Sequence, residues 1–421
     1  MKRYSLAVAI AVLILFVAVA YGYSGDPEQG KVTKTFTVSK GGQLTVSVDG
    51  GDIIIDTWDK NEVSVNASRL DADDEKDLTM SQSGNTITIE LERERTGWSS
   101  SSPRFEILIP NQFAIDFKTG GGDVTLLHDL TGEVGGKTGG GDIKLKGNIT
   151  GPVKISTGGG DIETANIKGD VKLTDGGGDI ETGDISGEVE AHTGGGNVRI
   201  GNVSDGKVKI STGGGDIQTG NIMSDAEVKT GGGNITLGKV SGELEMNTAG
   251  GDMKVESIGK SLKASTAGGN LRVGDVNGTA RASSAGGDIS LGNIRGDAEI
   301  STAGGDIDLE MVTGTIEAGT AGGDIQAHMK PSGNGSSSLK SAGGEIKLYL
   351  PSDAKATIEA RIKIEKHWGA SSKKYKVVSD FKADSYEEDE SRREICAVYT
   401  INGGGPKIQL STVNSNIYIQ K

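Results

Sequence analysis

An acidic or amide residue follows paired glycines at regular intervals through the middle of this chain, and evenly spaced carboxylates are potential calcium ligands. Thirteen copies are separated by intervals of 18 or 19 residues and one final interval of 21, and the residues are Asp123, Asp142, Asp161, Asp179, Asn197, Asp216, Asn234, Asp252, Asn270, Asp288, Asp306, Asp324 and Glu345. Calcium-binding β-rolls instead carry a GGxGxDxUx nonapeptide twice per turn. One GGD per repeat therefore argues against a β-roll calcium site.

The same side-chain oxygens have a structural use. If the copies stack at the spacing of β-strands, neighbouring carboxylates repel by about 0.9 kcal/mol even in water. Asn197, Asn234 and Asn270 interrupt the acidic series, which relieves repulsion while keeping a side-chain oxygen. We expect the series to cap a corner of the backbone, with calcium binding as the alternative. No residue is assigned as catalytic, metal-binding or cofactor-binding, and no cofactor is expected.

Other side chains with reactive groups lack the spacing of a known site. The GGG runs are followed by neither GK[ST] nor a helical pattern, so no nucleotide site is expected. Cys396, the single cysteine, lies in an alternating apolar run, which predicts a buried small residue. A Thr or Ser precedes the glycines in twelve of thirteen copies, Asp175 being the exception. Stacked hydroxyls can bond one another or the corner backbone, whereas an ice-binding surface needs a flat TxT array.

Composition narrows the class of fold. The chain has 421 residues with 68 Gly, only 7 Pro and 4% aromatic residues, and its formal net charge is −14. Glycine without proline excludes collagen, and scarce aromatics leave few large anchors for a globular core. The negative charge offers no basic footprint for nucleic acid. A repeat architecture is therefore expected.

Each repeat reads as two short strands. A typical unit, DISLGNIRGDAEISTAGG, has apolar residues at Ile289, Leu291, Ile294, Ala298 and Ile300 with polar residues between them. This alternation is typical of strands with one face turned inward. Fixing eighteen backbones costs about 18–36 kcal/mol, whereas five small apolar side chains return only about 8–15 kcal/mol. One unit cannot fold alone, so the sequence predicts an all-β fold, a parallel β-helix (β-solenoid) with about 18 residues per coil.

The glycines of the corner differ in tolerance. Seven copies read GGG and the last six read AGG, beginning with Ala249. The first position accepts a Cβ, so we expect ordinary backbone angles there. The second and third glycines never vary between copies, and we expect them to need a positive φ or a close approach between stacked backbones.

Four segments are expected. Residues 1–20 form a signal peptide, residues 21–118 an N-terminal β cap with the first coil or coils, and residues 119–350 the repeat β-solenoid. Residues 351–421 form C-terminal coils with a charged excursion and a closing cap. Dissimilar ends are expected because an open solenoid exposes strand edges that recruit other chains.

The N-terminal prediction rests on an export signal. Lys2 and Arg3 precede an apolar run at residues 6–20, with small residues at Ala18 and Ala20. The run is shorter than the about 20 residues that span a bilayer, so cleavage after Ala20 is expected, with an uncleaved anchor as the alternative. The chain is therefore expected to be extracytoplasmic: secreted, periplasmic or at the cell surface.

The repeats, of the form TGGGDI…G-x-V-x-I-x-T, resemble those of the bacterial putative-adhesin β-solenoid family, catalogued as a domain of unknown function. The early GGDIIIDTWDKNEVSV and the closing NGGGPKIQLSTVNSNIYI are similar to its end segments, so the resemblance covers about residues 31–421. It implies a secreted or surface β-helical protein with no assigned catalytic residues.

We therefore expect a non-enzymatic adhesin or structural and interaction module of the bacterial envelope. A carbohydrate-binding or polysaccharide-degrading β-helix protein is one alternative, although a lyase or hydrolase needs a convergent catalytic group. The dense, irregular residues 367–394 are instead interpreted as a solvated excursion. A membrane-anchored envelope regulatory partner is the other alternative. The expected partner is an envelope protein or a surface glycan, with no nucleic acid or nucleotide, and with membrane contact only through an uncleaved N-terminal segment.

Overall fold

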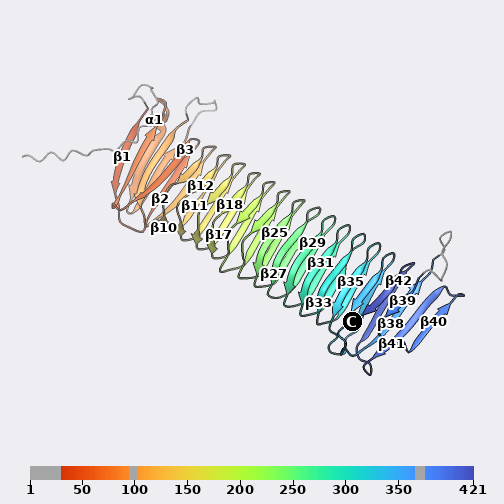
Figure 1. Ribbon diagram of the computed structural model, residues 1–421. Helices are drawn as coiled ribbons and strands as arrows, with labels where there is room; N and C mark the ends of the chain where they lie inside the picture. The colour runs from red at the N-terminus through yellow and green to blue at the C-terminus, as the bar shows by residue number, and fades with distance from the viewer. Residues whose placement is uncertain (1–29, 94–101, 366–374) are drawn as a thin grey trace, which may run out of the picture.

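The computed structural model describes residues 30–93, 102–365 and 375–421, which form an elongated stack of β-strand coils (Figure 1). Within these ranges the only helix is the single turn α1 (Asp74–Asp77). The strands stack along the long axis of the rod, and most of them are parallel. The predicted all-β fold, a parallel β-solenoid, is confirmed.

Two long sheets face each other across the core. In stacking order, sheet A comprises β1 (Val32–Thr37), β4 (Glu62–Ser68), β7 (Arg104–Pro110), β3 (Asp52–Trp58), β9 (Val124–Leu126), β12 (Ile143–Leu145), β15 (Ile162–Thr164), β18 (Ile180–Thr182), β21 (Val198–Ile200), β23 (Ile217–Thr219), β25 (Ile235–Val240), β27 (Met253–Ile258), β29 (Leu271–Val276), β31 (Ile289–Ile294), β33 (Ile307–Val312), β35 (Ile325–Met329), β37 (Ile346–Tyr349), β43 (Ile417–Gln420) and β39 (Val377–Ser379).

Sheet B contains the second strand of each coil. Its stacking order is β5 (Leu78–Ser83), β6 (Thr86–Leu91), β2 (Gly42–Val48), β8 (Phe113–Thr119), β11 (Val134–Thr138), β14 (Val153–Thr157), β17 (Val171–Asp175), β20 (Val189–Thr193), β22 (Val208–Thr212), β24 (Ala226–Thr230), β26 (Leu244–Asn247), β28 (Leu262–Thr266), β30 (Ala280–Ser284), β32 (Ala298–Ser301), β34 (Ile316–Thr320), β36 (Ser337–Ser341), β42 (Lys407–Val413), β38 (Ala356–Lys363), β41 (Glu394–Ile401) and β40 (Ser385–Asp389).

A short third row joins the two sheets in the early coils. It comprises β10 (Leu130–Thr131), β13 (Ile149–Thr150), β16 (Ile167–Lys168) and β19 (Ile185–Ser186). Single parallel bridges continue the row through Val203 and Ile222 to Val240. From β25 onward the sheet A strand is longer and includes this position. The cross-section therefore changes from three strands per coil to two.

The core is a stack of equivalent apolar side chains. In the coil that begins at Asp288, the five residues predicted to face inward are 0–2% exposed. Their register partners in the next coil are the equivalent residues, as in Ile289 with Ile307 and Leu291 with Leu309. Within the repeats, each of these side chains therefore packs on its own copy above and below, which is how the repeat core closes without aromatic anchors.

At both ends of the rod, strands outside the repeat cover the stack. Strand β3 lies between β9 and β7, and β7 pairs antiparallel with β4. At the other end β42 lies between β36 and β38, and β38 pairs antiparallel with β41. The N-terminal end also holds a buried ion pair between Asp74 and Arg93, 2.8 Å apart. The proposed domain boundaries stay predictions, and the signal peptide lies outside the described residues.

Candidate functional site

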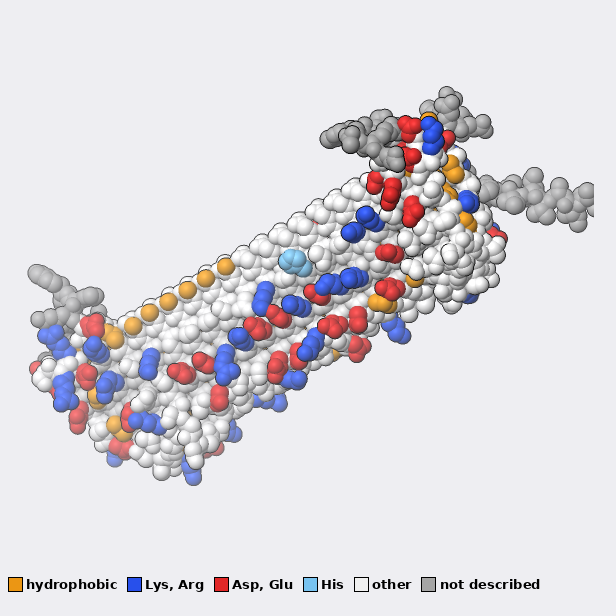
Figure 2. All heavy atoms as spheres, turned by 180° about the vertical axis from the view of Figure 1, so that it is seen from behind, with side chains coloured by type: hydrophobic (Ala, Val, Ile, Leu, Met, Phe, Trp, Pro, Cys, Tyr) orange, Lys and Arg blue, Asp and Glu red, His pale blue; other side chains and the backbone are white. Residues whose placement is uncertain are grey.

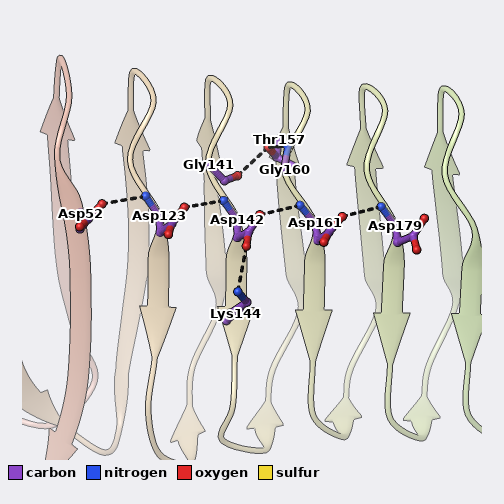
Figure 3. Close-up of polar contacts among 9 residues, drawn as sticks. All are labelled: Asp52, Asp123, Gly141, Asp142, Lys144, Thr157, Gly160, Asp161 and Asp179. Atoms are coloured by element: carbon purple, nitrogen blue, oxygen red, sulfur yellow. Dashed lines mark hydrogen bonds and ion pairs between the residues drawn. The ribbon is translucent and has the colours of Figure 1, made fainter.

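The aspartate ladder is the row of thirteen residues that follow the glycines, together with Asp52. Each member before Glu345 accepts a hydrogen bond at a side-chain oxygen from the backbone N–H of the next member, over 2.7–3.2 Å. Figure 3 shows four of these links from Asp52 to Asp179. The capping interpretation is confirmed: the oxygen acts as a backbone acceptor, which Asp and Asn supply equally.

Two ladder carboxylates also pair with cations, Asp142 with Lys144 and Glu345 with Lys347, the latter at 3.8 Å. The Lys144 ammonium lies 2.8 Å from Asp142 (Figure 3), and this hydrogen bond lowers the pKa of the Asp142 carboxyl below its ordinary value. Within the described residues, no group of three or more His, Cys, Asp and Glu side chains is placed to hold a metal ion. The ladder oxygens are therefore used along the rod rather than around a common centre.

The hydroxyl ladder lies inside the rod. Thr157 donates through Oγ1 to the Gly141 carbonyl of the preceding coil at 2.8 Å and accepts from its own Gly160 N–H at 3.2 Å (Figure 3). The equivalent threonines and serines repeat the bond to the preceding coil from Thr119 to Thr412. Because these side chains are buried, they cannot form an ice-binding surface.

The invariant glycines have different surroundings. A Cβ at Gly160, the third glycine, would lie 2.3 Å from the carbonyl oxygen of Gly141, whereas a Cβ at Gly159 would meet nothing within 4 Å. None of the corner glycines from Gly120 to Gly344 has a positive φ. The expected positive φ is therefore wrong, and the expected close approach holds for the third glycine only. At the middle glycine a Cβ would have no contact shorter than 3.9 Å in the GGG corners and would lie 3.3–3.6 Å from a carbonyl oxygen of the preceding coil in the AGG corners, which does not explain why this glycine is invariant.

The first corner position was expected to have ordinary backbone angles that accept a Cβ. In the GGG coils a Cβ at Gly158 would lie 2.1 Å from the Gly139 carbonyl oxygen. The AGG corners are not uniform in their backbone bonds, since Ala267 N–H donates to the Ala249 carbonyl, whereas Ala342 N–H donates to the Thr320 carbonyl as Gly176 N–H does to that of Thr157. Tolerance of alanine thus belongs to the AGG form of the corner, whose exposed methyl groups follow one edge of the rod (Figure 2).

A second oxygen ladder was missed from the sequence. At the next corner, Asp184 N–H donates to Asn166 Oδ1 at 2.8 Å, and Asn202 N–H donates to Asp184 at 2.7 Å. The row includes Asp129, Asn148, Asn166, Asp184, Asn202 and Asn221. Its signal was an Asn or Asp directly before an apolar residue, five or six residues after a member of the aspartate ladder, and the sequence was read there only for the apolar residue.

Asp175 breaks the hydroxyl ladder. It is 2% exposed, its Oδ1 accepts from the Gly177 N–H at 3.0 Å, and its Oδ2 has no hydrogen-bond partner. Burial raises the pKa of this carboxyl above its ordinary value. An ionised carboxylate cannot donate to the carbonyl of the preceding coil as threonine does, so this position is a local weakness.

Two expectations, those for Cys396 and for residues 367–394, can be compared with the structure, which also places Trp58. The prediction that Cys396 is buried is wrong. Its side chain is partly exposed on the outward face of β41 and lines a groove with Arg361. Trp58 is partly buried in the N-terminal end and donates to the Glu62 carbonyl at 2.7 Å. The predicted excursion at residues 367–394 lies partly outside the described residues, and its described part contains the exposed strand β40.

The outer faces of the rod bear rows of charged side chains (Figure 2). A groove of about 720 Å³ lies on the outer face of sheet B across β8, β11, β14 and β17. Four exposed lysines line it: Lys118, Lys137, Lys154 and Lys172. Lys172 pairs with Glu190 at 2.7 Å, and the other three make no ion pair with any described residue. Sequence reasoning missed this cluster because its members lie in three different repeats and the preceding strand.

These features define a class of protein: a parallel β-solenoid whose coils are joined by side-chain oxygen and hydroxyl ladders. The chain belongs to the Toastrack DUF4097 family, whose model matches residues 42–293 and 238–365. Among curated protein sequences, none matches this chain.

Solved structures of several bacterial proteins are similar to this chain. One is described as a putative adhesin from Bacteroides fragilis, with 15% identity over 61% of this chain and 98% of that one, and a TM-score of 0.29. A putative adhesin from Parabacteroides merdae has 12% identity over 69% and 96%, with a TM-score of 0.25. A putative lipid binding protein from Parabacteroides distasonis has 16% identity over 69% and 97%, with a TM-score of 0.23. The fold assignment rests on the strands of this chain itself.

Proposed function

We propose that this protein is an extracytoplasmic, non-enzymatic interaction module of the bacterial envelope, a rod that presents binding surfaces in the manner of an adhesin. The observation that carries the proposal is that the polar side chains fall into two groups, those that bond the backbone at the corners and those that face solvent. The ladder oxygens and hydroxyls bind backbone groups of adjacent coils. The charged residues of the outer faces are left as the surface on which a partner can bind.

The rod supports this role mechanically. Parallel strands hydrogen-bond each coil to the next, and both corner ladders add bonds in the same direction. A binding surface on such strands is held in place without a large core. In the part of the chain that the structure describes, none of the helical structure could span a membrane. The apolar run at residues 6–20 supports export.

Cell fractionation tests the location. A C-terminally tagged full chain is expressed in a bacterium, and its matched control lacks residues 1–20. The full chain should reach an extracytoplasmic fraction with an N-terminus beginning at Tyr21, while the control stays in the cytoplasm. Retention of both chains in the cytoplasm would contradict the proposal, and a full-length chain in the membrane fraction would favour the anchored alternative.

Binding tests the role itself. The purified full chain is applied to a glycan array and to envelope fractions, beside a soluble protein of similar net charge. Saturable retention specific to the rod, with no change in the bound glycan, supports an interaction module. Cleavage of a polysaccharide would instead establish the enzymatic alternative.

A further inference from the structure

The lysine groove on sheet B has an unusual arrangement of charge. Lys118 and Lys137 are register partners on β8 and β11, and Lys154 and Lys172 are register partners on β14 and β17. Neighbouring parallel strands lie about 4.8 Å apart, so each pair places two ammonium groups side by side. Like charges directly opposite one another destabilise a sheet. The fold therefore accepts an unfavourable arrangement here, in a chain whose net charge is −14.

Like charges are also register partners farther along the same face, as in Glu227 with Glu245 and Lys263 with Arg281, but ion pairs with adjacent strands offset them there. Glu245 and Lys263 are register partners and form an ion pair at 3.1 Å, as do Arg281 and Glu299 at 2.9 Å. The like-charged partners farther along the rod therefore include residues that are held in ion pairs. The unneutralised lysines near the N-terminal end stand out from this pattern.

A missing side chain forms the hollow. Gly135 occupies the outward position between Asp116 and Lys154, where other coils carry long side chains. A Cβ at Gly135 would make only ordinary contacts, 3.4 Å from Asp116 Oδ1, so packing does not require glycine there. The adjacent Gly136 differs, because a Cβ there would lie 2.5 Å from the Phe117 ring. Gly136 serves the core, whereas Gly135 leaves the outer surface open.

The groove is open, and both polar and apolar atoms line it. Ser156, Thr174 and Gln43 also line it, which adds hydroxyl and amide groups between the lysines. The large hydrophobic side chains exposed on the described surface are Met223, Val378 and Tyr386, and none lines this groove. It therefore has ammonium and hydroxyl groups for an anionic, hydroxylated ligand but no apolar anchor for insertion into a lipid bilayer.

We propose that this groove binds an extended anionic polysaccharide, with the lysines contacting its carboxylate or sulfate groups and Ser156 and Thr174 contacting its hydroxyls. The inference rests on the proposed function as an interaction module and names the chemistry of its ligand. Successive strands repeat the lysines along the rod, so a polymer lying in that direction meets several of them at once. Asp116, which lies beside Gly135, and Glu133 also line the groove, and with four lysines the lining keeps a net positive charge.

Direct binding of defined polymers to the full chain tests this proposal. The probes are polygalacturonate, dextran sulfate and neutral dextran. Wild-type protein should bind both anionic polymers and not dextran, and added salt should weaken the binding because it screens exposed charges. Lys137→Gln with Lys154→Gln should weaken it by about tenfold or more, since bonds to charged groups contribute about 1.5–3 kcal/mol.

Two controls distinguish binding in the groove from nonspecific attraction of the polymer to positive charge. Lys229→Gln with Lys263→Gln removes the same charge from the same sheet, but these lysines are paired with Glu227 and Glu245, so polymer binding should change less than about twofold. Gly135→Glu should abolish binding by placing a carboxylate in the hollow, and Gly135→Gln should retain most of it. Circular dichroism and thermal midpoints should match wild type for every variant.

Several outcomes would overturn the inference. They are equal losses for the two lysine double variants, an unchanged affinity in Gly135→Glu, and no binding of either anionic polymer. Lysine-dependent binding to vesicles of anionic lipid in preference to both polymers would assign the groove to a membrane surface instead. Each result leaves the cellular location to the fractionation experiment, so failure of this inference is distinguishable from failure of the proposed function.

Discussion

Individual hydroxyl and carboxyl oxygens at the glycine corners make defined hydrogen bonds, and the coil in which one of these bonds is absent can be identified. Thr157 both donates to the preceding coil and accepts within its own corner. Asp175 occupies the equivalent position in the next coil but, when ionised, can only accept. The glycines beside them are also unequal, since Gly160 lies against a carbonyl and Gly159 faces open space.

The unequal glycines predict unequal costs of substitution. Gly160→Ala forces a Cβ to within 2.3 Å of the Gly141 carbonyl oxygen, so we expect a loss of about 1–3 kcal/mol in unfolding free energy, as for an overpacked site. Gly159→Ala should cost less than about 0.5 kcal/mol, as for an exposed surface site. Urea denaturation midpoints measure both. Similar losses at the two positions would contradict the packing role assigned to Gly160.

Asp175 predicts a pH dependence. Its folded-state pKa is raised by burial, so its contribution to stability is fully present below the ordinary value of 3.8 and is lost as the pH rises through the folded value. Asp175→Thr restores the hydroxyl and removes this loss. The variant should therefore be more stable than wild type near pH 7, with a smaller difference near pH 4.

Thermal midpoints across pH 4–7 measure this effect as the difference between Asp175→Thr and wild type. Asp216→Asn is the control, because it removes an exposed ladder carboxylate that is not buried in a corner. A stability difference for Asp175→Thr that does not change with pH would show that the carboxyl is not the cause.

At the scale of the element, each corner combines a ladder with a strand end. The apolar alternation predicted the strands well: Ile289, Leu291, Ile294, Ala298 and Ile300 are all buried. It could not predict which polar residues bond between coils, because an outward Asn and a corner Asn look alike in one repeat. The sequence also could not predict the conformation of the glycine corner. A glycine required for a positive φ and a glycine required for close backbone approach give the same invariant position in the repeats.

The aspartate ladder predicts that oxygen matters more than charge. Asp288 Oδ1 accepts from the Asp306 N–H at 2.9 Å, and Asp288→Asn keeps that acceptor while removing repulsion from Asp306. Asp288→Asn should therefore be neutral or slightly stabilising, whereas Asp288→Ala should cost about 0.5–1.5 kcal/mol. Urea titrations at low and high salt measure both, and salt should reduce only the repulsion. An equal loss in the two variants would assign the role to the charge.

At the scale of the whole molecule, function and stability occupy different parts of the same rod. Equivalent apolar side chains from successive coils fill the interior. The outward residues of one coil can therefore differ from those of its neighbours without changing the core. The lysine groove depends on this freedom, because Lys118, Lys137 and Lys154 come from three successive strands of sheet B. A scan of single repeats sees one lysine at a time, which is why the candidate site required the three-dimensional register.

This independence predicts that whole coils can be removed. Deleting residues 270–305 removes 36 residues, two coils of 18, and joins Gly269 to Asp306. The Asp306 N–H then meets Asp252 Oδ1, as the Asn270 N–H does now. Outward Lys263 becomes the neighbour of Glu317 and Lys254 the neighbour of Asp308, both opposite in charge. The shortened chain should fold with the same strand content and a rod about 10 Å shorter.

A deletion out of phase supplies the control. Removing residues 270–296 deletes one and a half coils, so a sheet B strand would follow the glycine corner where a sheet A strand belongs. Inward residues would then meet the wrong corner, and the aspartate ladder would be cut. Small-angle scattering gives the maximum dimension and circular dichroism the strand content. If the two deletions unfold to the same extent, coils are not interchangeable units, and stability must depend on contacts longer in range than adjacent repeats.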